Sequence, residues 1–198
     1  ASTAAETAGN RNSAARLAQA GTLWAILRPG DAPMKKFTEA WREVVLFDEH
    51  TWGAADSVSD PEGENARFQW DFKKSFAARA DRLSRELLEA ACARPSPTGT
   101  SSARTAVDVV NTCSWPRTDI VVVPAGMSAA GDAVKDAAVN PVPSQRLSTG
   151  ELAFLAAGVP GLGAKRFFID GGRATAKGQA RIRENGLENA ALAVNIDP

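Results

Sequence analysis

The sequence predicts an α+β protein in which an N-terminal three-helix bundle is followed by an antiparallel β-sandwich domain. Apolar residues recur every three or four positions through the first half, which is the period of an amphipathic helix. A stretch rich in Pro, Ser and Thr follows. Short β-branched runs between turn residues fill the second half, which is typical of antiparallel sheets. We expect a bundle at residues 1–94, a linker at 95–103 and a β-domain at 104–198.

Start and stop signals separate the three expected helices. Thr3 and Glu6 have the spacing of a capping box, and Pro29-Gly30 ends the first helix. The second helix begins near Asp31, and the third opens at Asp60-Pro61. Each carries an apolar stripe that we expect in the core, made of Leu17, Ala20, Trp24 and Leu27, then Met34, Phe37, Trp41 and Val44, then Phe68, Phe72, Phe76, Leu83 and Leu87.

Six segments have strand character: residues 107–110, 120–123, 151–156, 165–169, 180–183 and 190–196. Asn111 is expected to form an Asx turn, and Trp115 is expected to cover the sandwich. The glycine-rich run at 158–163 lacks the Lys-Ser/Thr of a phosphate-binding loop, so it predicts a plain loop.

Composition argues against several classes of partner. The 198 residues hold 23 basic and 23 acidic side chains, and no basic stripe predicts binding to nucleic acid or to a membrane surface. No apolar run approaches the roughly 20 residues that cross a bilayer. Cys92 and Cys113 are read as two free thiols or one incidental bridge. The chain begins inside an expected helix without a signal peptide, which suggests a fragment or a processed chain and leaves the compartment open.

Potential metal ligands concentrate in one loop, at residues 47–60. Asp48, Glu49 and His50 are adjacent, and His50 is the only histidine of the chain. Zinc needs about four ligands that converge in space, so this run can supply one corner of a zinc site but cannot complete it. The alternative is that His50 is a hydrogen-bonded loop residue.

Five sequence runs, in order, resemble glycoside hydrolase family 38. The first is the N-terminal twenty residues, and the second is LFDEHTWGAADSVSDP at 46–61, with its flanks EAWREV and FQWDFKKSFAARA. The others are VVNTCSWPRTDIVVVP at 109–124, VPSQRLSTGELAFLAAGVPGLG at 142–163 and LENAALAVNIDP at 187–198. The resemblance covers nearly the whole chain and implies the helical middle domain and first β-domain of a retaining α-mannosidase, with residues 187–198 starting a further β-domain.

The resemblance implies one zinc ion bound by two histidines and two aspartates. One of these aspartates is also the nucleophile. Most of these residues, and every catalytic one, are expected in a catalytic domain upstream of Ala1. His50 is the expected metal ligand from this chain, although counting back from Gly53 places Glu49 or Asp48 at the family histidine. Asp48 and Glu49 are otherwise candidates for binding the hydroxyls of a mannose-containing glycan.

Two functions from different classes follow. The first is a segment of a zinc-dependent α-mannosidase that supplies one zinc ligand and part of the rim of the sugar site, and that is inactive alone. The alternative is a non-catalytic carbohydrate-binding or scaffold module. In either case the alternation at 190–196 places Leu192, Val194 and Ile196 on one face of a terminal strand. We expect this strand to self-associate with another copy or to dock onto its own sandwich.

Overall fold

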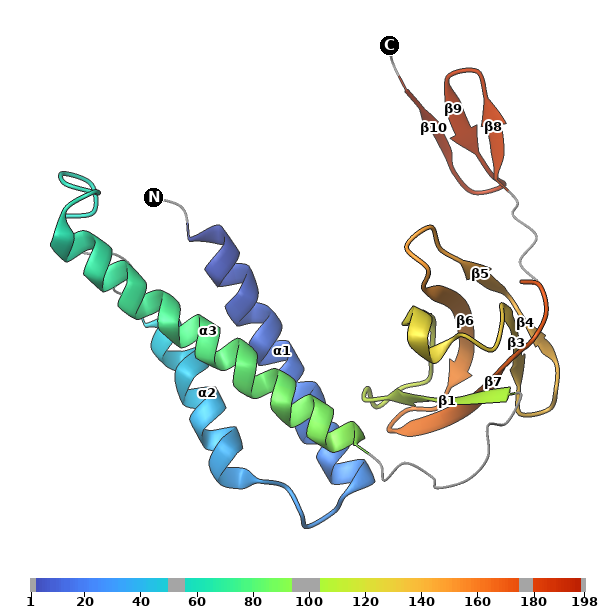
Figure 1. Ribbon diagram of the computed structural model, residues 1–198, viewed down its shortest axis with the longest axis horizontal. Helices are drawn as coiled ribbons and strands as arrows, with labels where there is room; N and C mark the ends of the chain where they lie inside the picture. The colour runs from blue at the N-terminus through green and yellow to red at the C-terminus, as the bar shows by residue number, and fades with distance from the viewer. Residues whose placement is uncertain (1–2, 50–55, 94–103, 175–179, 197–198) are drawn as a thin grey trace. The chain divides into compact units, whose positions relative to one another are not determined.

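The computed structural model describes residues 3–49, 56–93, 104–174 and 180–196, and the chain divides into two compact units at residues 1–98 and 99–198. The first unit holds three packed helices and the second holds antiparallel sheets (Figure 1). The predicted α+β fold class is therefore confirmed.

The helices are α1 (Ala4–Leu27), α2 (Met34–Asp48) and α3 (Glu64–Cys92). Helix α1 ends where Pro29-Gly30 predicted, and Gly30 adopts a φ of 90°, which favours glycine. The predicted capping box is wrong in its main contact, because the Thr3 side chain makes no capping hydrogen bond. No helix in the described part of the chain is long and apolar enough to cross a membrane.

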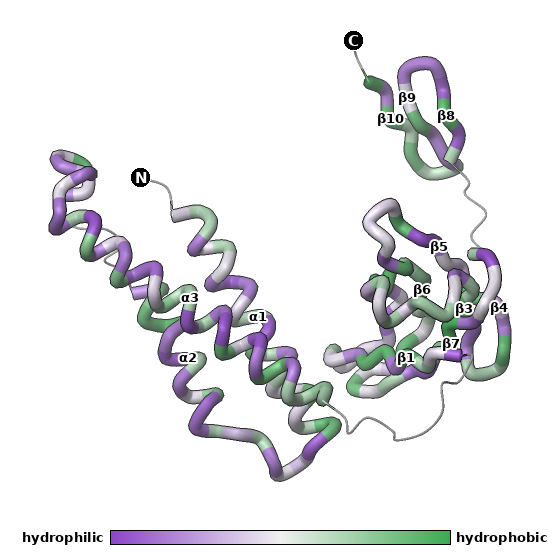
Figure 2. Tube along the Cα trace, viewed as in Figure 1, coloured by the Kyte–Doolittle hydropathy of each residue, from purple (hydrophilic) through white to green (hydrophobic). Residues whose placement is uncertain are grey.

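The bundle core comes from one face of each helix, and in Figure 2 hydrophilic and hydrophobic residues alternate along all three. Its buried apolar members are Leu17, Ala20, Leu23, Trp24, Phe37, Ala40, Val44, Phe47, Ala66, Phe76, Ala77, Ala80, Leu83, Leu87 and Ala91. The indole nitrogen of Trp24 donates to the carbonyl of Leu87, so this large side chain is both packed and satisfied.

Five residues of the predicted stripes lie outside this core. Leu27 is half-buried, and Met34, Trp41, Phe68 and Phe72 are exposed, Phe68 by 69%. The ion pairs Lys73–Glu49 and Lys74–Glu6 mark where the end of α2 and the start of α1 meet α3. Phe68 and Phe72 precede that level, so α3 extends past both neighbouring helices there (Figure 1). The apolar period continues along α3, but the helices that would cover it do not.

Three ion pairs fix the antiparallel register of α2 against α3. Lys36 pairs with Glu86 at 2.6 Å, Glu43 with Arg79 at 2.7 Å, and Glu49 with Lys73 at 2.6 Å. From one pair to the next the chain advances seven and then six residues along α2 and moves back by the same numbers along α3. We call this set the ion-pair ladder.

Two sheets make the sandwich of the second unit. One sheet has the order β1 (Arg104–Asn111), β7 (Gly163–Asp170), β3 (Ala133–Asp136) and β4 (Pro141–Val142). The other has the order β2 (Arg117–Val123), β6 (Leu152–Val159) and β5 (Ser144–Arg146), and a short helix η1 (Ala125–Met127) follows β2. All strand pairs are antiparallel. Their shared core includes Val123, Val134, Leu152, Phe154, Phe167 and Ile169.

The Asn111 turn is confirmed, since its carboxamide oxygen accepts the amide of Cys113 at 3.0 Å, two residues on. The expectation for Trp115 is wrong, because this side chain is 62% exposed. Cys92 and Cys113 are both free thiols.

A third sheet has the order β10 (Ala193–Asn195), β9 (Gly186–Glu188) and β8 (Arg181–Arg183). The terminal strand therefore pairs with β9, which neither of the two expected arrangements included. Ile182 lies opposite Leu187, and Leu187 lies opposite Val194, so these three side chains form one apolar row across the sheet. All three are exposed.

Candidate functional site

The predicted carboxylates lie where α2 ends. Asp48 is the last residue of the helix, and Glu49 follows it with an extended backbone at φ −56° and ψ 140°. Asp48 is exposed and Glu49 is half-buried. Because Glu49 has left the helix, its side-chain direction depends on contacts from elsewhere in the bundle.

Helix α1 contacts this end through Asn10. Its side-chain amide donates to the carbonyl of Val44 at 3.2 Å and to Oδ1 of Asp48 at 3.0 Å. Asn10 is 1% exposed, and its own Oδ1 is buried without a hydrogen-bond partner among the described residues. A buried amide thus binds the last turn of α2 to α1.

Helix α3 contacts the same end through Lys73. Its ammonium group lies 2.6 Å from Oε2 of Glu49, and the lysine side chain is only 15% exposed. Charge-assisted hydrogen bonds of this kind are shorter and stronger than neutral ones. A fixed cation at Glu49 also opposes the binding of a second cation to the same carboxylate.

The remaining predicted ligand, His50, lies outside the described residues, as does the segment 50–55 that follows it. Among the residues that the structure does describe, no group of three His, Cys, Asp or Glu side chains is arranged to hold a metal ion. Asp56 opens the turn before α3 and is exposed. The structure thus shows Asp48 bound to α1 and Glu49 bound to α3, and the metal ligand stays a prediction.

Sequence reasoning missed both Asn10 and Lys73. Asn10 precedes Leu17 by seven residues on the buried face of α1, and a polar residue on an apolar face is the signal that could have identified it. Lys73 gave no such signal, because it lies next to Lys74 in a charged run that reads as a solvated face.

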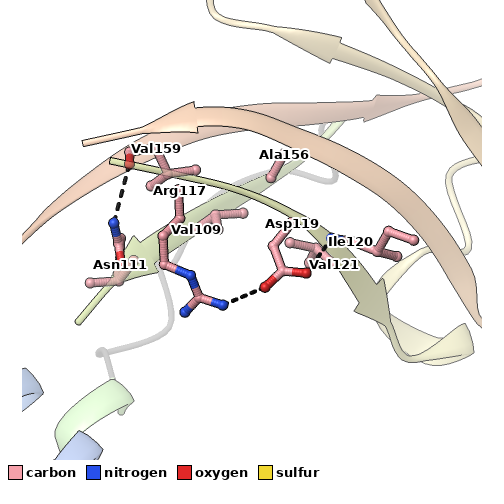
Figure 3. Close-up of a pocket in the computed structure, with 9 residues that line it drawn as sticks. Val109, Asn111, Arg117, Asp119, Ile120, Val121, Ala156 and Val159 are labelled. Carbon is pink, nitrogen blue, oxygen red and sulfur yellow. Dashed lines mark hydrogen bonds and ion pairs between the residues drawn. The ribbon is translucent and has the colours of Figure 1, made fainter. Parts of the chain in front are cut away.

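The second unit contains a cavity that could be considered as a separate sugar site. It lies between β1, β2 and β6, has a volume of about 170 Å³, and is lined by Val109, Asn111, Arg117, Asp119 and Ala156 among others (Figure 3). Arg117 pairs with Asp119 at 2.5 Å, and the side-chain amide of Asn111 donates to the carbonyls of Trp115 and Val159. The cavity volume is below the roughly 300–1,000 Å³ of sites for drug-sized ligands, and these polar groups already bind one another or the backbone.

A larger apolar cavity, of about 600 Å³, lies between the end of α1 and the start of α2. Trp24, Phe37, Met34 and Trp41 line it, and Arg28 is its one charged lining residue, with its guanidinium 5.4 Å from the ring centre of Trp24. Its lining includes no carboxylate or histidine, so it offers no acid–base pair for glycoside cleavage.

Comparison with models of protein families finds no match, and comparison with curated proteins finds none either. Solved structures do match. One is the crystal structure of a protein in glycosyl hydrolase family 38 from Enterococcus faecalis, with a TM-score of 0.61 at 15% identity over 100% of this chain. Another is an alpha-mannosidase from Enterococcus faecalis V583, with a TM-score of 0.43 at 17% identity over 91% of this chain and 26% of its own length.

The first match assigns the fold. This chain spans 28% of the length of that family 38 protein, and all of its own length is matched. The predicted resemblance is therefore confirmed for the fold: residues 1–198 share the architecture of a portion of a glycoside hydrolase family 38 protein.

Proposed function

We propose that this chain is the helical and first β portion of a retaining, zinc-dependent α-mannosidase. The observation that carries the proposal is the match of the whole chain, from bundle to third sheet, to about a quarter of a family 38 protein. The five sequence runs that resemble the family occur in the same order and support the same assignment. The nucleophile, the general acid and the other zinc ligands then belong to a catalytic domain outside residues 1–198, and a larger β-domain follows.

The residues around the end of α2 fit a zinc site that is only completed by another domain. Glu49 is held by Lys73 and Asp48 by Asn10, so both carboxylates have partners within the bundle. His50 is then the best donor of the run, because a neutral imidazole suits zinc, whereas Glu49 already binds the ammonium of Lys73. When bound, zinc would act as a Lewis acid toward sugar oxygens.

In this proposal Asp48 and Glu49 accept hydrogen bonds from sugar hydroxyls at the rim of the site. A carboxylate has about four acceptor positions, so one that already accepts a bond from Asn10 or Lys73 still has capacity for hydroxyl donors. Both residues immediately precede the proposed ligand, which places sugar recognition and metal binding in one short segment.

The alternative is a carbohydrate-binding or scaffold module without a metal. The coding sequence upstream of Ala1 separates the two. A domain there with a His-x-Asp pair and a further aspartate supports the enzyme, whereas an open reading frame that starts near Ala1 supports the module.

Activity provides the direct test. Residues 1–198 alone are expected to show no turnover of an aryl α-mannoside with added zinc, because the nucleophile and most ligands are elsewhere. In the full-length protein His50→Ala should lower zinc content and activity together, and Glu62→Gln, an exposed change in the turn before α3, should alter neither. Chelator-sensitive turnover by residues 1–198, or normal zinc content in His50→Ala, would contradict the assignment.

A further inference from the structure

We infer that Asn10 and Lys73 are positioning residues that orient the carboxylates of Asp48 and Glu49 for the sugar. The inference rests on the proposed function, because it assigns a purpose to contacts at the site proposed above. Its physical basis is that two different helices each direct one side chain to one of two consecutive carboxylates.

Packing alone does not explain an asparagine at position 10. Asn10 is almost fully buried on the apolar face of α1, and its carboxamide oxygen has no hydrogen-bond partner among the described residues. A leucine has the same branched shape, with as many side-chain heavy atoms, and would bring no buried acceptor that lacks a partner. What the amide does provide is a pair of donors that join the α2 backbone at Val44 to the Asp48 carboxylate.

Lys73 differs from the other cations of the ion-pair ladder. Arg79 pairs with Glu43 in the body of α2, and Lys36, itself on α2, pairs with Glu86 in the body of α3. In both pairs the carboxylate belongs to a residue whose backbone is helical. Glu49 comes after the last residue of α2 and has an extended backbone, so Lys73 pairs with a residue outside the body of either helix. The lysine side chain is only 15% exposed and its ammonium end lies 2.6 Å from the carboxylate, which limits the positions that Glu49 can take.

The contacts of Asn10 and Lys73 restrain two adjacent residues from two different helices. Asn10 comes from α1 and Lys73 from α3, and α2 is the helix that both contact. Any shift of α2 along α3 would move Glu49 away from Lys73 and break the ladder as a whole. The orientation of the two carboxylates is thereby tied to the packing of the whole bundle.

The first test uses residues 1–198 and does not depend on any enzyme. We expect Asn10→Leu and Lys73→Met to lower the backbone order parameters of Asp48 and Glu49 from about 0.85 to below about 0.6, while the rest of α2 and the melting temperature stay nearly unchanged. Lys74→Met removes the neighbouring lysine, whose ammonium lies 3.9 Å from the carboxylate of Glu6. This variant should leave the order parameters of Asp48 and Glu49 unchanged. Lys73→Arg should restore order at Glu49.

Unchanged order at Asp48 and Glu49 in both variants would overturn the inference. So would a uniform loss of order through all three helices, which would mean that Asn10 and Lys73 serve stability alone. Because the chain has one histidine, its imidazole NMR signals report directly on whether the effect reaches the adjoining residue.

The second test separates this inference from the proposed function. In the full-length enzyme Lys73→Met should raise KM about tenfold with little change in kcat, as expected for a residue that orients another, and Lys73→Arg should reverse the effect. If order is lost as expected but KM is unchanged in both Lys73→Met and Glu49→Gln, the sugar role in the proposed function is wrong and the positioning remains supported.

Discussion

Asp170 joins three strands of one sheet. It lies on β7, and its carboxylate contacts Arg104 of β1 at 2.7 Å and Lys135 of β3 at 2.9 Å. The ammonium of Lys135, and then the guanidinium of Arg104, hold the pKa of Asp170 below its ordinary value. A carboxylate with a lowered folded-state pKa stabilises the fold above its unfolded-state pKa, and this contribution is lost as the pH falls through the folded-state pKa.

The β-unit should therefore lose stability as the pH falls below about 4, the region of the unfolded aspartate pKa. Asp170→Asn should lower the melting temperature at pH 7 and reduce the further fall in acid, because the titrating group is gone. Thermal unfolding followed by circular dichroism between pH 2.5 and 7 measures both effects. Glu184→Gln, at an exposed carboxylate, is the control, and parallel curves for Asp170→Asn and the parent chain would contradict the prediction.

Gly161 is required by a close approach of two backbones. Gly161 lies in the turn between β6 and β7, and Ser114 lies in the turn between β1 and β2. A Cβ atom at Gly161 would lie 2.4 Å from the carbonyl oxygen of Ser114. The amide of Leu162 donates to the carbonyl of Cys113 at 2.8 Å, so the two turns are held together there.

Gly161→Ala is accordingly expected to destabilise the β-unit by about 1–3 kcal/mol, the usual cost of overpacking against atoms that cannot move aside. Gly126→Ala is the matched control, because a Cβ atom at Gly126 meets nothing within 4 Å. Urea unfolding measures both, and equal midpoints for the two variants would show that the turns can separate without cost.

At the scale of elements, the ion-pair ladder does not hold α2 and α3 equally at each step. Glu43 is buried, whereas Lys36 and Glu86 are both more than a third exposed. Exposed pairs contribute about 0–1 kcal/mol, because water screens them and both side chains lose rotamer freedom. A buried carboxylate that loses its partner costs more, because its desolvation is no longer compensated.

We expect Arg79→Met to destabilise the bundle by about 1–3 kcal/mol, and Glu43→Met combined with Arg79→Met to recover most of that loss. Lys36→Met should cost less than about 1 kcal/mol. A double-mutant cycle at Glu43 and Arg79, followed by chemical unfolding, gives the coupling free energy. A coupling no larger than that of Lys36 with Glu86 would contradict this ranking.

The helices were predictable because each carries a repeated apolar face and ends at glycine or proline signals. Strands β3, β4, β5 and β9 were missed; they have two to four residues, too few for alternation to show. The equally short β8 and β10 were predicted only within the longer segments 180–183 and 190–196. The burial of Phe68 and Phe72 was predicted wrongly, since periodicity within α3 carries no information on where its neighbours end. Asp48 and Glu49 were singled out by their residue type, and their role at a site stays a prediction. Their contacts with Asn10 and Lys73 join residues distant in sequence, which no local pattern reveals.

At the scale of the molecule, the third sheet has one uncovered apolar face. The row of Ile182, Leu187 and Val194 is exposed, while the opposite face carries Arg183 paired with Glu188. Three strands of three residues bury little by themselves, so this sheet is expected to gain stability by pairing its apolar face with another surface.

Purified residues 1–198 should accordingly self-associate, with a mass in light scattering that rises above 20.8 kDa as concentration increases. Val194→Lys should return the mass toward that of the monomer, because it introduces a charge into the apolar row. Val58→Lys adds the same charge at an exposed position in the turn before α3 and should leave association unchanged. A monomer at every concentration would show that the apolar row is tolerated in water.

The ion-pair ladder lies entirely within the first 93 residues, and so do the described contacts of the bundle with its own core. Every residue needed to assemble the helices is therefore synthesised before the first strand begins. At about 5–20 residues per second, a ribosome needs roughly 5–20 s to add residues 94–198, far longer than a helical bundle needs to fold. The bundle, with Asp48 and Glu49 already held by Asn10 and Lys73, can thus be complete while the β-unit is still being made.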